Sequence, residues 1–522
     1  MKRQDSLQTI DSYDGYWDMV VIGGGATGLG CALDASSRGY KTLLVEQHDF
    51  AKGTSSRSTK LIHGGVRYLQ QGNIALVLEA LHERGLLMNN APHLVRNQAF
   101  IVPNYEWWDG PFYGVGLKVY DLLAGRLGLG TSKGLSKAET LQQIPTLEPD
   151  RLRGGIIYHD GQFDDARLAI NLAQSIVDAG GTPVNYTRVT GLTYSGKMID
   201  GVKLKDTFDG REREVRARVV INATGIFTDD LLRMDRPDAK PIITHSQGVH
   251  LVLDARFLKG KTAIMVPQTE DGRVLFAVPW HNRVLVGTTD TPVDGPSLEP
   301  LPLEEEIDFI LKHAAQYMVE DPTRADILCM FAGLRPLVGS VGDKKTAAIS
   351  RDHHLEVSPS GLVTITGGKW TTYRKMAEDA VNQAALIAGL PESECRTRKL
   401  RIHGWLKNMD PQDQLQAYGS DAVFLQRLID ADARMGAHLH PALPYTRAEV
   451  VWAVRSELAL TIEDVLARRT RALILDAAAS RAAATQVAEL MARELGHDAA
   501  WQRRQVEAYQ RLAGGYLPRA GS

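Results

Sequence analysis

The clearest chemical pattern in this sequence is formed by three glycines near its N-terminus. Gly23, Gly25 and Gly28 have the spacing G-x-G-x-x-G. In this pattern the first glycine permits a tight turn, the second lets the backbone approach a pyrophosphate, and the third lets a helix pack on a strand. The apolar run Met19–Ile22 predicts a buried parallel strand before the glycines, and Ala26–Arg38 predicts a helix after them. The positive end of that helix would face the phosphates of a dinucleotide.

An acidic residue follows at the distance expected for a ribose ligand. The run Thr42–Val45 predicts a second strand, and Glu46 stands at its end, about 18 residues after Gly28. A glycine-rich pattern alone is also compatible with an ordinary turn, but here strand, helix, second strand and terminal acid agree. A carboxylate at this place argues against the 2′-phosphate of NADP. The sequence therefore predicts a site for a dinucleotide other than NADP.

A second glycine motif lies far downstream. Gly367 and Gly368 precede Lys369 and a predicted helix that reaches Ala377. One interpretation is a plain glycine-rich entry into a helix, and the other is a turn that aims the helix at the same cofactor. The loop Thr54–Leu69 is rich in hydroxyls, glycine and positive charge, which suits either a solvated loop or hydrogen bonds to phosphate. One large cofactor held by a discontinuous domain explains these motifs better than two separate sites.

The composition excludes several other classes of protein. Among 522 residues, 60 Lys and Arg nearly balance 62 Asp and Glu, so no overall charge points to nucleic acid. Cys31, Cys329 and Cys395 stand alone, which gives neither a zinc signature nor a disulfide framework and favours a reducing compartment. The polar residues 1–15 lack a secretion signal, and no apolar run is long enough to cross a bilayer. We therefore expect a cytoplasmic protein, with membrane contact that is at most peripheral.

Four stretches of the chain together resemble the FAD-dependent, quinone-linked glycerol-3-phosphate dehydrogenases. These stretches are IGGGATGLGCALDASSRG (22–39), TKLIHGGVRYL (59–69), FAGLRPL (331–337) and GGKWTTYRKMA (367–377). YHDGQFDDARL (158–168) and the C-terminal region fit as well. Leu29, where the family more often has a smaller residue, is a mild departure that affects nothing essential.

The resemblance implies a function. The family binds FAD tightly, oxidises sn-glycerol 3-phosphate to dihydroxyacetone phosphate by hydride transfer to flavin N5, and passes electrons to membrane quinone. It acts in the catabolism of glycerol and glycerophospholipids and in respiration. Alternatives are an oxygen-reducing glycerol-3-phosphate oxidase and an amine- or amino-acid-oxidising flavoprotein of the same fold. A non-catalytic FAD-binding module is a further alternative.

The predicted elements indicate an α/β protein of three parts. A Rossmann-like FAD domain, similar to those of glutathione reductase and D-amino-acid oxidase, is discontinuous, and a substrate or cap domain contains an antiparallel sheet. The C-terminal domain is helical, with candidate helices Leu458–Asp476 and Ala478–Leu495 and no catalytic constellation. We expect residues 16–90, 151–240 and 331–390 in the FAD domain, 91–150 and 241–330 in the cap domain, and 399–522 in the C-terminal domain.

The resemblance also implies the residues that act on the substrate. His250 is the candidate base for the C2 hydroxyl, because the pKa of histidine suits proton abstraction near neutral pH. Arg335 would stabilise negative charge that develops on the C2 oxygen. The substrate phosphate is expected to bind Arg67, Arg351 and Lys369, and Tyr68 is expected to orient it. A lone histidine on a strand or a single cation is also compatible with a purely structural role.

Predicted FAD contacts come from six segments. The turn Ala223–Thr224–Gly225 resembles one that lies near the cofactor in glutathione-reductase-like flavoproteins. The helix after Gly368 would stabilise the anionic reduced flavin with its N-terminal end. The full predicted set is Gly23, Gly25, Ala26, Thr27, Gly28, Glu46, Gln47, Ser55, Ser56, Ser58, Thr59, Lys60, His63, Gly64, Gly65, Val189, Ala223, Thr224, Gly225, Gly368, Lys369, Trp370, Thr371 and Thr372.

One segment is a candidate for membrane contact. Residues 105–133 combine a dense aromatic and apolar cluster with interspersed lysine and arginine, as in segments that lie in a bilayer interface. The acidic residues Glu106, Asp109 and Asp121 weaken that pattern, and a core helix of the cap domain is the alternative. We expect peripheral attachment at the cytoplasmic face of the inner membrane, a homodimer, no bound metal and no nucleic-acid partner.

Overall fold

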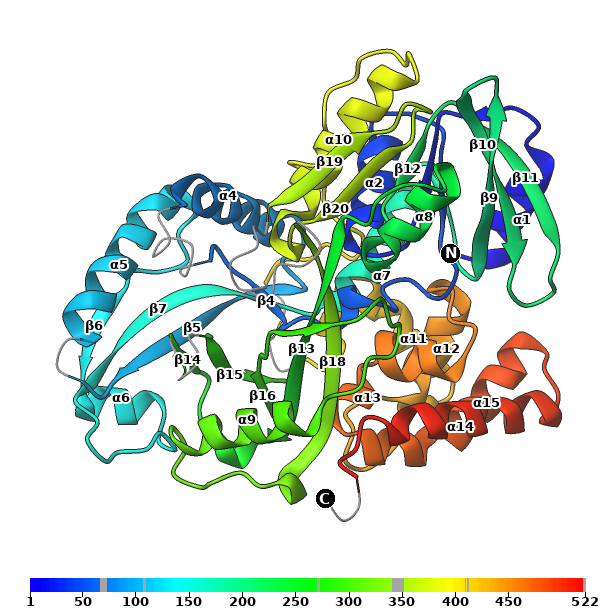
Figure 1. Cartoon of the computed structure of the whole chain (residues 1–522). Coiled ribbons are helices and arrows are strands. Elements are labelled where there is room, and N and C mark those ends of the chain that lie inside the picture. Colours follow the sequence, from blue (N-terminus) through cyan, green and yellow to red (C-terminus); the bar gives the residue numbers. More distant parts are fainter. Residues whose placement is uncertain are drawn as a thin grey trace.

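The computed structural model describes residues 1–65, 73–106, 109–267, 269, 273–339, 352–408, 410 and 413–519. These residues form three sheets with their helices and a helical C-terminal part (Figure 1). The prediction of an α/β fold with a C-terminal helical domain is confirmed.

The first sheet carries the N-terminal glycine motif. Its order is β19-β20-β12-β2-β3-β8, and its strands run parallel from β20 to β8, while β19 is antiparallel to β20. Its strands are β2 (Met19–Ile22), β3 (Thr42–Val45), β8 (Thr182–Val184), β12 (Val220–Asn222), β19 (His353–Val357) and β20 (Val363–Gly367). The predicted strands Met19–Ile22 and Thr42–Val45 are therefore confirmed.

Two different layers cover this sheet. Helices α2 (Ala26–Ser37), α7 (Asp165–Asp178) and α10 (Tyr373–Ile387) pack on one face, where Met19 and Val21 are buried. On the other face Val20 and Ile22 pack against the four-stranded sheet β1-β11-β10-β9. Its elements are β1 (Tyr16–Trp17), β9 (Thr187–Ser195), β10 (Met198–Asp206) and β11 (Glu212–Ala217), flanked by α1 (Arg3–Ser12) and α8 (Thr228–Asp235). Because both faces are covered, every residue of β2, β3 and β12 is buried.

The third sheet forms the cap and one wall of the site. Its main path is β17-β13-β16-β15-β14-β5-β7-β4, with β18 paired to β13 and β6 paired to β7. All these pairs are antiparallel except β5 with β14. The strands are β4 (Leu61–Ile62), β5 (Val95–Asn104), β6 (Lys133–Ser136), β7 (Gly154–Phe163), β13 (Ile243–Asp254), β14 (Ala263–Val266), β15 (Leu275–Trp280), β16 (Arg283–Gly287), β17 (Thr291–Val293) and β18 (Ile327–Val338).

This sheet crosses the predicted domain boundaries. Strands β4 and β7, together with most of β18, belong to ranges predicted for the FAD domain, yet they pair within the cap sheet. Helices α4 (Ile74–Asn90) and α5 (Asp109–Ala124) contact each other, and α5 packs on one face of this sheet, whereas α6 (Lys137–Gln143) and α9 (Glu304–Ala315) pack on the other face (Figure 1).

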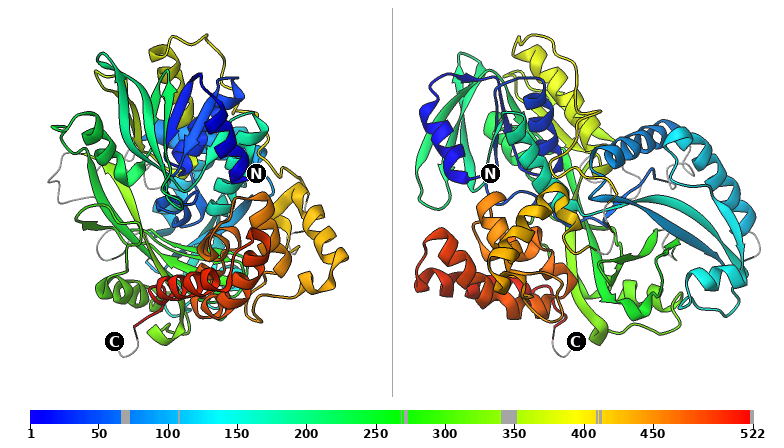
Figure 2. Two further views of the ribbon diagram at one scale, coloured as in Figure 1. Left: turned by 90° about the vertical axis from the view of Figure 1, so that its right-hand side faces the viewer. Right: turned by 180° about the vertical axis from the view of Figure 1, so that it is seen from behind.

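The C-terminal helices pack beneath the first sheet (Figure 2). They are α11 (Ala422–Ala431), α12 (Arg447–Ser456), the π-helix η10 (Asp464–Arg469), α13 (Ala472–Leu475), α14 (Ala477–Leu495) and α15 (Ala499–Gly514). The prediction of one helix over Leu458–Asp476 is wrong. Arg471 has a left-handed backbone with φ 66°, which separates η10 from α13. An apolar periodicity could not reveal this break, because the arginine is held there by tertiary contacts described below.

Candidate active site

The turn after β2 has the geometry of a phosphate cradle. Gly23 has φ +111°, and a Cβ atom added there would lie 2.5 Å from the carbonyl oxygen of Ala223. A Cβ on Gly28 would lie 1.8 Å from the carbonyl oxygen of Gly23, so the third glycine permits α2 to pack against the turn. The backbone N–H of Ala26 donates to Oγ of Ser55 at 2.9 Å. The helix N-terminus and the serine loop are thus joined at the place where a pyrophosphate would bind.

Glu46 lies at the end of β3 and faces the same space. Its carboxylate accepts hydrogen bonds from the backbone N–H groups of Gly24 at 2.6 Å and His48 at 2.8 Å. Burial raises the pKa of this carboxyl, although the two hydrogen bonds act against that rise. A carboxylate oriented in this way can accept hydrogen bonds from ribose hydroxyls.

Two cavities run from the glycine motif to the cap sheet. The first, of about 430 Å³, is lined by Gly23, Glu46, Val189 and the turn 223–225 among others. The second, of about 300 Å³, lies against β13 and β18. Both are lined by Thr54, Pro336 and residues 367–370, so they meet at the second glycine motif. A long cofactor with a nucleotide at one end and a reactive ring at the other fits this arrangement.

The two glycine motifs are linked through Ser55, which accepts hydrogen bonds from both. Nε1 of Trp370 donates to the carbonyl oxygen of Ser55 at 2.8 Å. Residues Trp370–Thr372 form a short 3₁₀ helix that leads into α10. Lys369 lines both cavities, immediately before this helix. The 3₁₀ turn and α10 follow the predicted glycine entry, and they begin where the cavities meet.

His250 lies on β13 in the wall of the second cavity. Its Nε2 is 2.9 Å from Oγ1 of Thr59, and its ring stacks on that of Phe331 with centroids 5.0 Å apart. Its Nδ1 is buried and has no hydrogen-bond partner within the described part of the chain. Burial, followed by the positive charges of Lys60 and Arg335, lowers the pKa of His250 well below its ordinary value. The imidazole is therefore neutral at pH 7 and can accept a proton.

Arg335 lies on β18 opposite Ser246 of β13 and lines the same cavity. Its Nη2 donates to Oγ1 of Thr288 and to the carbonyl oxygen of Thr289, each at 3.1 Å. Its Nη1 is 3.7 Å from Oδ1 of Asp290. The guanidinium is held in one orientation beside the cavity that contains His250.

Most predicted cofactor residues line one or both cavities. Lining residues from the predicted set are Gly23, Gly25, Ala26, Thr27, Glu46, Gln47, Ser55, Ser58, Thr59, His63, Gly65, Val189, Ala223, Thr224, Gly225, Gly368, Lys369, Trp370 and Thr371. Gly28, Ser56, Lys60, Gly64 and Thr372 line neither. Nζ of Lys60 instead pairs with Asp165 at 2.6 Å, fully buried behind the loop. The predicted phosphate ligands Arg67, Tyr68 and Arg351 lie outside the described residues.

Some lining residues were not predicted from the sequence. Arg57, Arg273 and Asp290 line the second cavity, and Lys52 lines the first. Asp290 comes shortly after a strand in the turn TTDTP, a position where a polar side chain commonly serves a site. Arg57 belongs to the loop Thr54–Leu69, whose charge and hydroxyls suit phosphate binding, whereas Lys52 and Arg273 have no local sequence signal that distinguishes them from surface cations.

The described residues contain neither a candidate metal site nor a membrane-spanning helix. No group of three or more His, Cys, Asp or Glu side chains in this part of the chain could hold a metal ion. None of the described helices is long and apolar enough to span a membrane.

Comparison with known proteins agrees with this geometry. Residues 18–374 match the family of FAD-dependent oxidoreductases, and residues 363–502 match the C-terminal domain of alpha-glycerophosphate oxidase. The mitochondrial glycerol-3-phosphate dehydrogenases of Rattus norvegicus and Homo sapiens are each 41% identical over 98% of this chain and 75% of their own length.

A solved structure shows the same fold. The glycerol-3-phosphate dehydrogenase from Bacillus halodurans, complexed with FAD, superposes with a TM-score of 0.81 and 28% identity, covering 100% of this chain and 99% of that one. The Gly23 cradle, the carboxylate of Glu46 and the joined cavities fit the same cofactor. The chain therefore belongs to the family of FAD-dependent glycerol-3-phosphate dehydrogenases, oxidoreductases that act on a CH–OH group.

Proposed function

We propose that this protein oxidises sn-glycerol 3-phosphate to dihydroxyacetone phosphate and passes the electrons through FAD to a membrane quinone. The observation that carries this proposal is the second cavity, where a neutral His250 and a fixed Arg335 line one space with Lys369. That set provides a base, a cation for a developing oxyanion and a cation for a phosphate. The names of the relatives support the same substrate.

The residues of the second cavity have separate roles in alcohol oxidation. Removing two electrons from a secondary alcohol takes a hydride from carbon and a proton from oxygen, and FAD when bound supplies the hydride acceptor. Because Nδ1 of His250 is buried, Nε2 is the nitrogen that accepts the proton, and it does so through Thr59. The hydroxyl of Thr59, which also lines this cavity, donates its own proton to Nε2 as its Oγ1 takes the C2 hydroxyl proton. Arg335 stabilises the negative charge on the C2 oxygen as the proton leaves.

Phosphate recognition falls to the cations near the second glycine motif. Lys369 lies where both cavities meet, so its ammonium group can bind a phosphate of a substrate whose C2 faces His250. Arg67 and Arg351, with Tyr68 as an orienting group, stay predicted partners of the same phosphate. An arginine suits this role because its planar fork binds two oxygens.

Electron transfer to quinone calls for contact with a membrane. Four apolar side chains of the neighbouring helices α4 and α5 are exposed: Ile74 and Leu78 on α4, and Val119 and Leu122 on α5, of which Leu122 is 81% exposed. We propose that α5, within the segment 105–133, lies on the cytoplasmic face of the inner membrane as a peripheral contact. A homodimer is proposed on family resemblance alone.

Anaerobic flavin absorbance tests the proposal. Adding sn-glycerol 3-phosphate to the FAD-loaded protein should bleach the flavin within one turnover and form dihydroxyacetone phosphate. The sn-1 enantiomer serves as the control and should leave the flavin oxidised. No bleaching by the sn-3 compound in a folded, FAD-loaded sample would refute the substrate. Bleaching by an amino acid instead would favour an amino-acid oxidase, and no bleaching by either would favour a non-catalytic FAD module.

A second experiment identifies the electron acceptor. Residues 363–502 match a domain named for an oxidase, so an oxygen-reducing glycerol-3-phosphate oxidase is the second candidate. Substrate-reduced protein is mixed either with a short-chain ubiquinone in vesicles or with air-saturated buffer. Faster flavin reoxidation by the quinone supports the dehydrogenase, and rapid reoxidation by oxygen with formation of peroxide supports the oxidase.

A further inference from the structure

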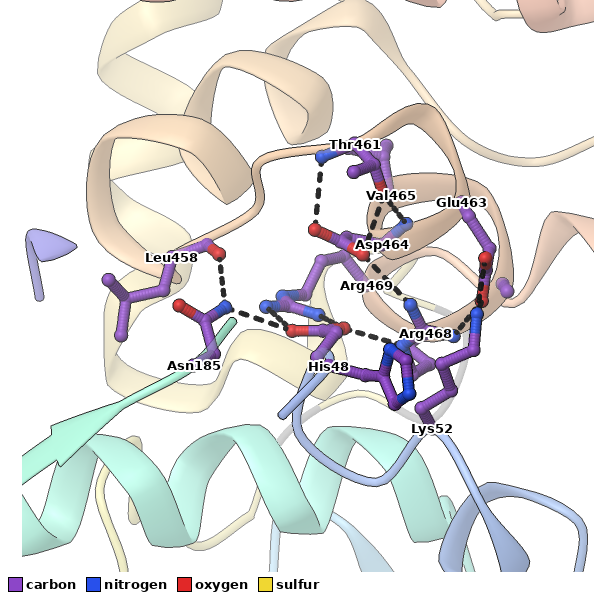
Figure 3. Close-up of polar contacts among 12 residues, drawn as sticks. His48, Lys52, Asn185, Leu458, Thr461, Glu463, Asp464, Val465, Arg468 and Arg469 are labelled. Atoms are coloured by element: carbon purple, nitrogen blue, oxygen red, sulfur yellow. Dashed lines mark hydrogen bonds and ion pairs between the residues drawn. The ribbon is translucent and has the colours of Figure 1, made fainter. Parts of the chain in front are cut away.

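The C-terminal domain supplies none of the described residues that line either cavity, yet its arginines reach the loop 46–60 that forms much of the first cavity (Figure 3). We propose that Arg468, Arg469 and Arg471 are positioning residues for FAD, and that the C-terminal domain completes the cofactor site by holding this loop at both ends. This assigns a role to a domain in which the sequence indicates no chemistry. The inference concerns binding of FAD and does not depend on the substrate or the electron acceptor.

The first contact is a buried carboxylate shared by two arginines. Arg469 binds both oxygens of Asp49, through Nη1 at 2.5 Å and Nη2 at 2.9 Å, and Nε of Arg468 adds a third bond at 2.5 Å. The side chains of Asp49 and Arg469 are fully buried. Burial alone would raise the pKa of Asp49, but the charges of Arg469 and Arg468 outweigh it and lower that pKa to about 2. Asp49 is therefore ionised and locked in place at neutral pH.

Asp49 lies in the turn that presents Glu46 to the cofactor. One carboxylate oxygen of Glu46 accepts the N–H of His48, and the N–H of Ala51 donates to the carbonyl oxygen of Gly24 at 2.9 Å. Glu46, His48 and Ala51 all line the first cavity. Because Asp49 stands between these residues, displacement of its carboxylate would move the ribose ligand and the glycine cradle together.

The helix η10, which carries Arg468 and Arg469, also orients Lys52, a cation of the first cavity. Nζ of Lys52 binds the two oxygens of Glu463 at 2.9 and 2.7 Å, and Nη1 of Arg468 binds Glu463 at 2.7 Å. Lys52 lines the first cavity, whereas Glu463 and Arg468 belong to the C-terminal domain. Arg468 thus connects the anchor at Asp49 with the anchor of Lys52 (Figure 3).

The third arginine holds the far end of the loop. Nη2 of Arg471 donates to the carbonyl oxygen of Ser56 at 2.9 Å and to Oδ1 of Asp165 at 3.0 Å. Its left-handed backbone turns the chain from η10 to α13 and directs this side chain into the interior. Ser55, the neighbour of Ser56, bonds to both glycine motifs. Arg471 therefore positions the part of the loop that joins the two halves of the site.

Buried ion pairs of this kind specify position more than they add stability. Removing water from buried charges offsets most of their attraction, but breaking one partner leaves an uncompensated charge and is costly. The geometry demands arginine, because a lysine has the charge but not the planar fork that binds both carboxylate oxygens. A substitution by lysine therefore tests position rather than charge.

The test compares two buried arginine pairs between the same parts of the molecule. Arg469→Lys changes the pair with Asp49. The control is Arg167→Lys on α7, because Arg167 binds both oxygens of Glu457 at 2.8 Å, is equally buried, and lines neither cavity. Full-length apo-protein of each variant is titrated with FAD, followed by flavin fluorescence, and the thermal midpoint is recorded with and without FAD.

We expect the Kd for FAD to rise at least about tenfold in Arg469→Lys, equivalent to about 1.4 kcal/mol, and to stay within about twofold of wild type in Arg167→Lys. Both variants should lose thermal stability in the apo form, because each breaks a buried pair. Equal changes of Kd in the two variants, or an unchanged Kd in Arg469→Lys, would overturn the proposal.

A milder variant tests the proposal in the case that Arg469→Lys does not fold. Glu463→Gln keeps the shape of the side chain but removes the charge that binds Lys52 and Arg468. We expect its Kd for FAD to rise about threefold or more, with the apo-protein still folded by circular dichroism. A Kd equal to that of wild type would refute a role for this network in FAD binding.

Discussion

The hydrogen bond between Thr59 and His250 allows a quantitative prediction. Oγ1 of Thr59 is 2.9 Å from Nε2 of His250, and His250 is only 2% exposed. Thr59→Val removes the hydroxyl and keeps the branched shape of the side chain. Loss of a hydrogen bond with a buried group left unsatisfied costs about 1–3 kcal/mol.

If the hydrogen bond between Thr59 and His250 is needed in the transition state, its loss raises the activation barrier for flavin reduction. An increase of about 1–3 kcal/mol in the barrier lowers the rate constant about 5- to 150-fold. The assay is anaerobic stopped-flow reduction of the flavin at saturating sn-glycerol 3-phosphate. We expect the rate constant of Thr59→Val to fall within that range.

The matched control is Thr59→Ser, which keeps the hydroxyl and should stay within about threefold of wild type. The Kd for FAD is measured for both variants, because Thr59 also lines the second cavity. A Thr59→Val protein that binds FAD normally and reduces it at the wild-type rate would refute proton transfer to His250 through Thr59.

Three further predictions follow from the geometry. His250→Asn should lower the rate of flavin reduction about 10²- to 10⁴-fold with FAD still bound. In the wild type the lowered pKa keeps His250 neutral, so kcat/KM should show no loss due to this group between pH 8 and 6.5. A tenfold fall of kcat/KM in that range would contradict this prediction. Gly23→Ala should abolish stable FAD binding, seen as colourless protein after gel filtration, because the added Cβ would lie 2.5 Å from the carbonyl oxygen of Ala223. Asp49, with its pKa lowered from 3.8 to about 2, contributes stability that is complete above pH 3.8 and is lost as pH falls towards 2; acid unfolding of Asp49→Asn should lack that part of the pH dependence.

Local patterns in the sequence predicted the nucleotide end of the site. The strand Met19–Ile22, the turn at Gly23 and the acid Glu46 depend on neighbours close in the chain, and the structure places them as predicted. Such patterns are readable because a buried strand, a left-handed turn and a strand end each limit the residue types at fixed positions. FAD and the dehydrogenase family, which resemblance implied, are confirmed by the comparisons.

Contacts between distant segments could not be predicted in this way. Lys60 stands among the hydroxyls of a loop that suits a cofactor, yet it turns away to Asp165 because a buried carboxylate lies behind the loop. The helix predicted over Leu458–Asp476 is broken at Arg471, whose side chain binds residues more than 300 positions away. In both cases the burial of a charge decided the outcome, and burial depends on packing across the whole fold.

The sequence by itself determined the strand–turn–helix unit, the place of Glu46 at the end of the second strand and the helical character of the C-terminus, and resemblance gave the family and its cofactor. Only the tertiary structure brought His250 of β13 within 2.9 Å of Thr59 and placed Arg335 of β18 in the same cavity. It also carried the arginines at 468 and 469 to Asp49, more than 400 residues earlier in the chain. The physical reason is that periodicity encodes which face of an element is buried, whereas the partner of a buried polar group is chosen by three-dimensional packing.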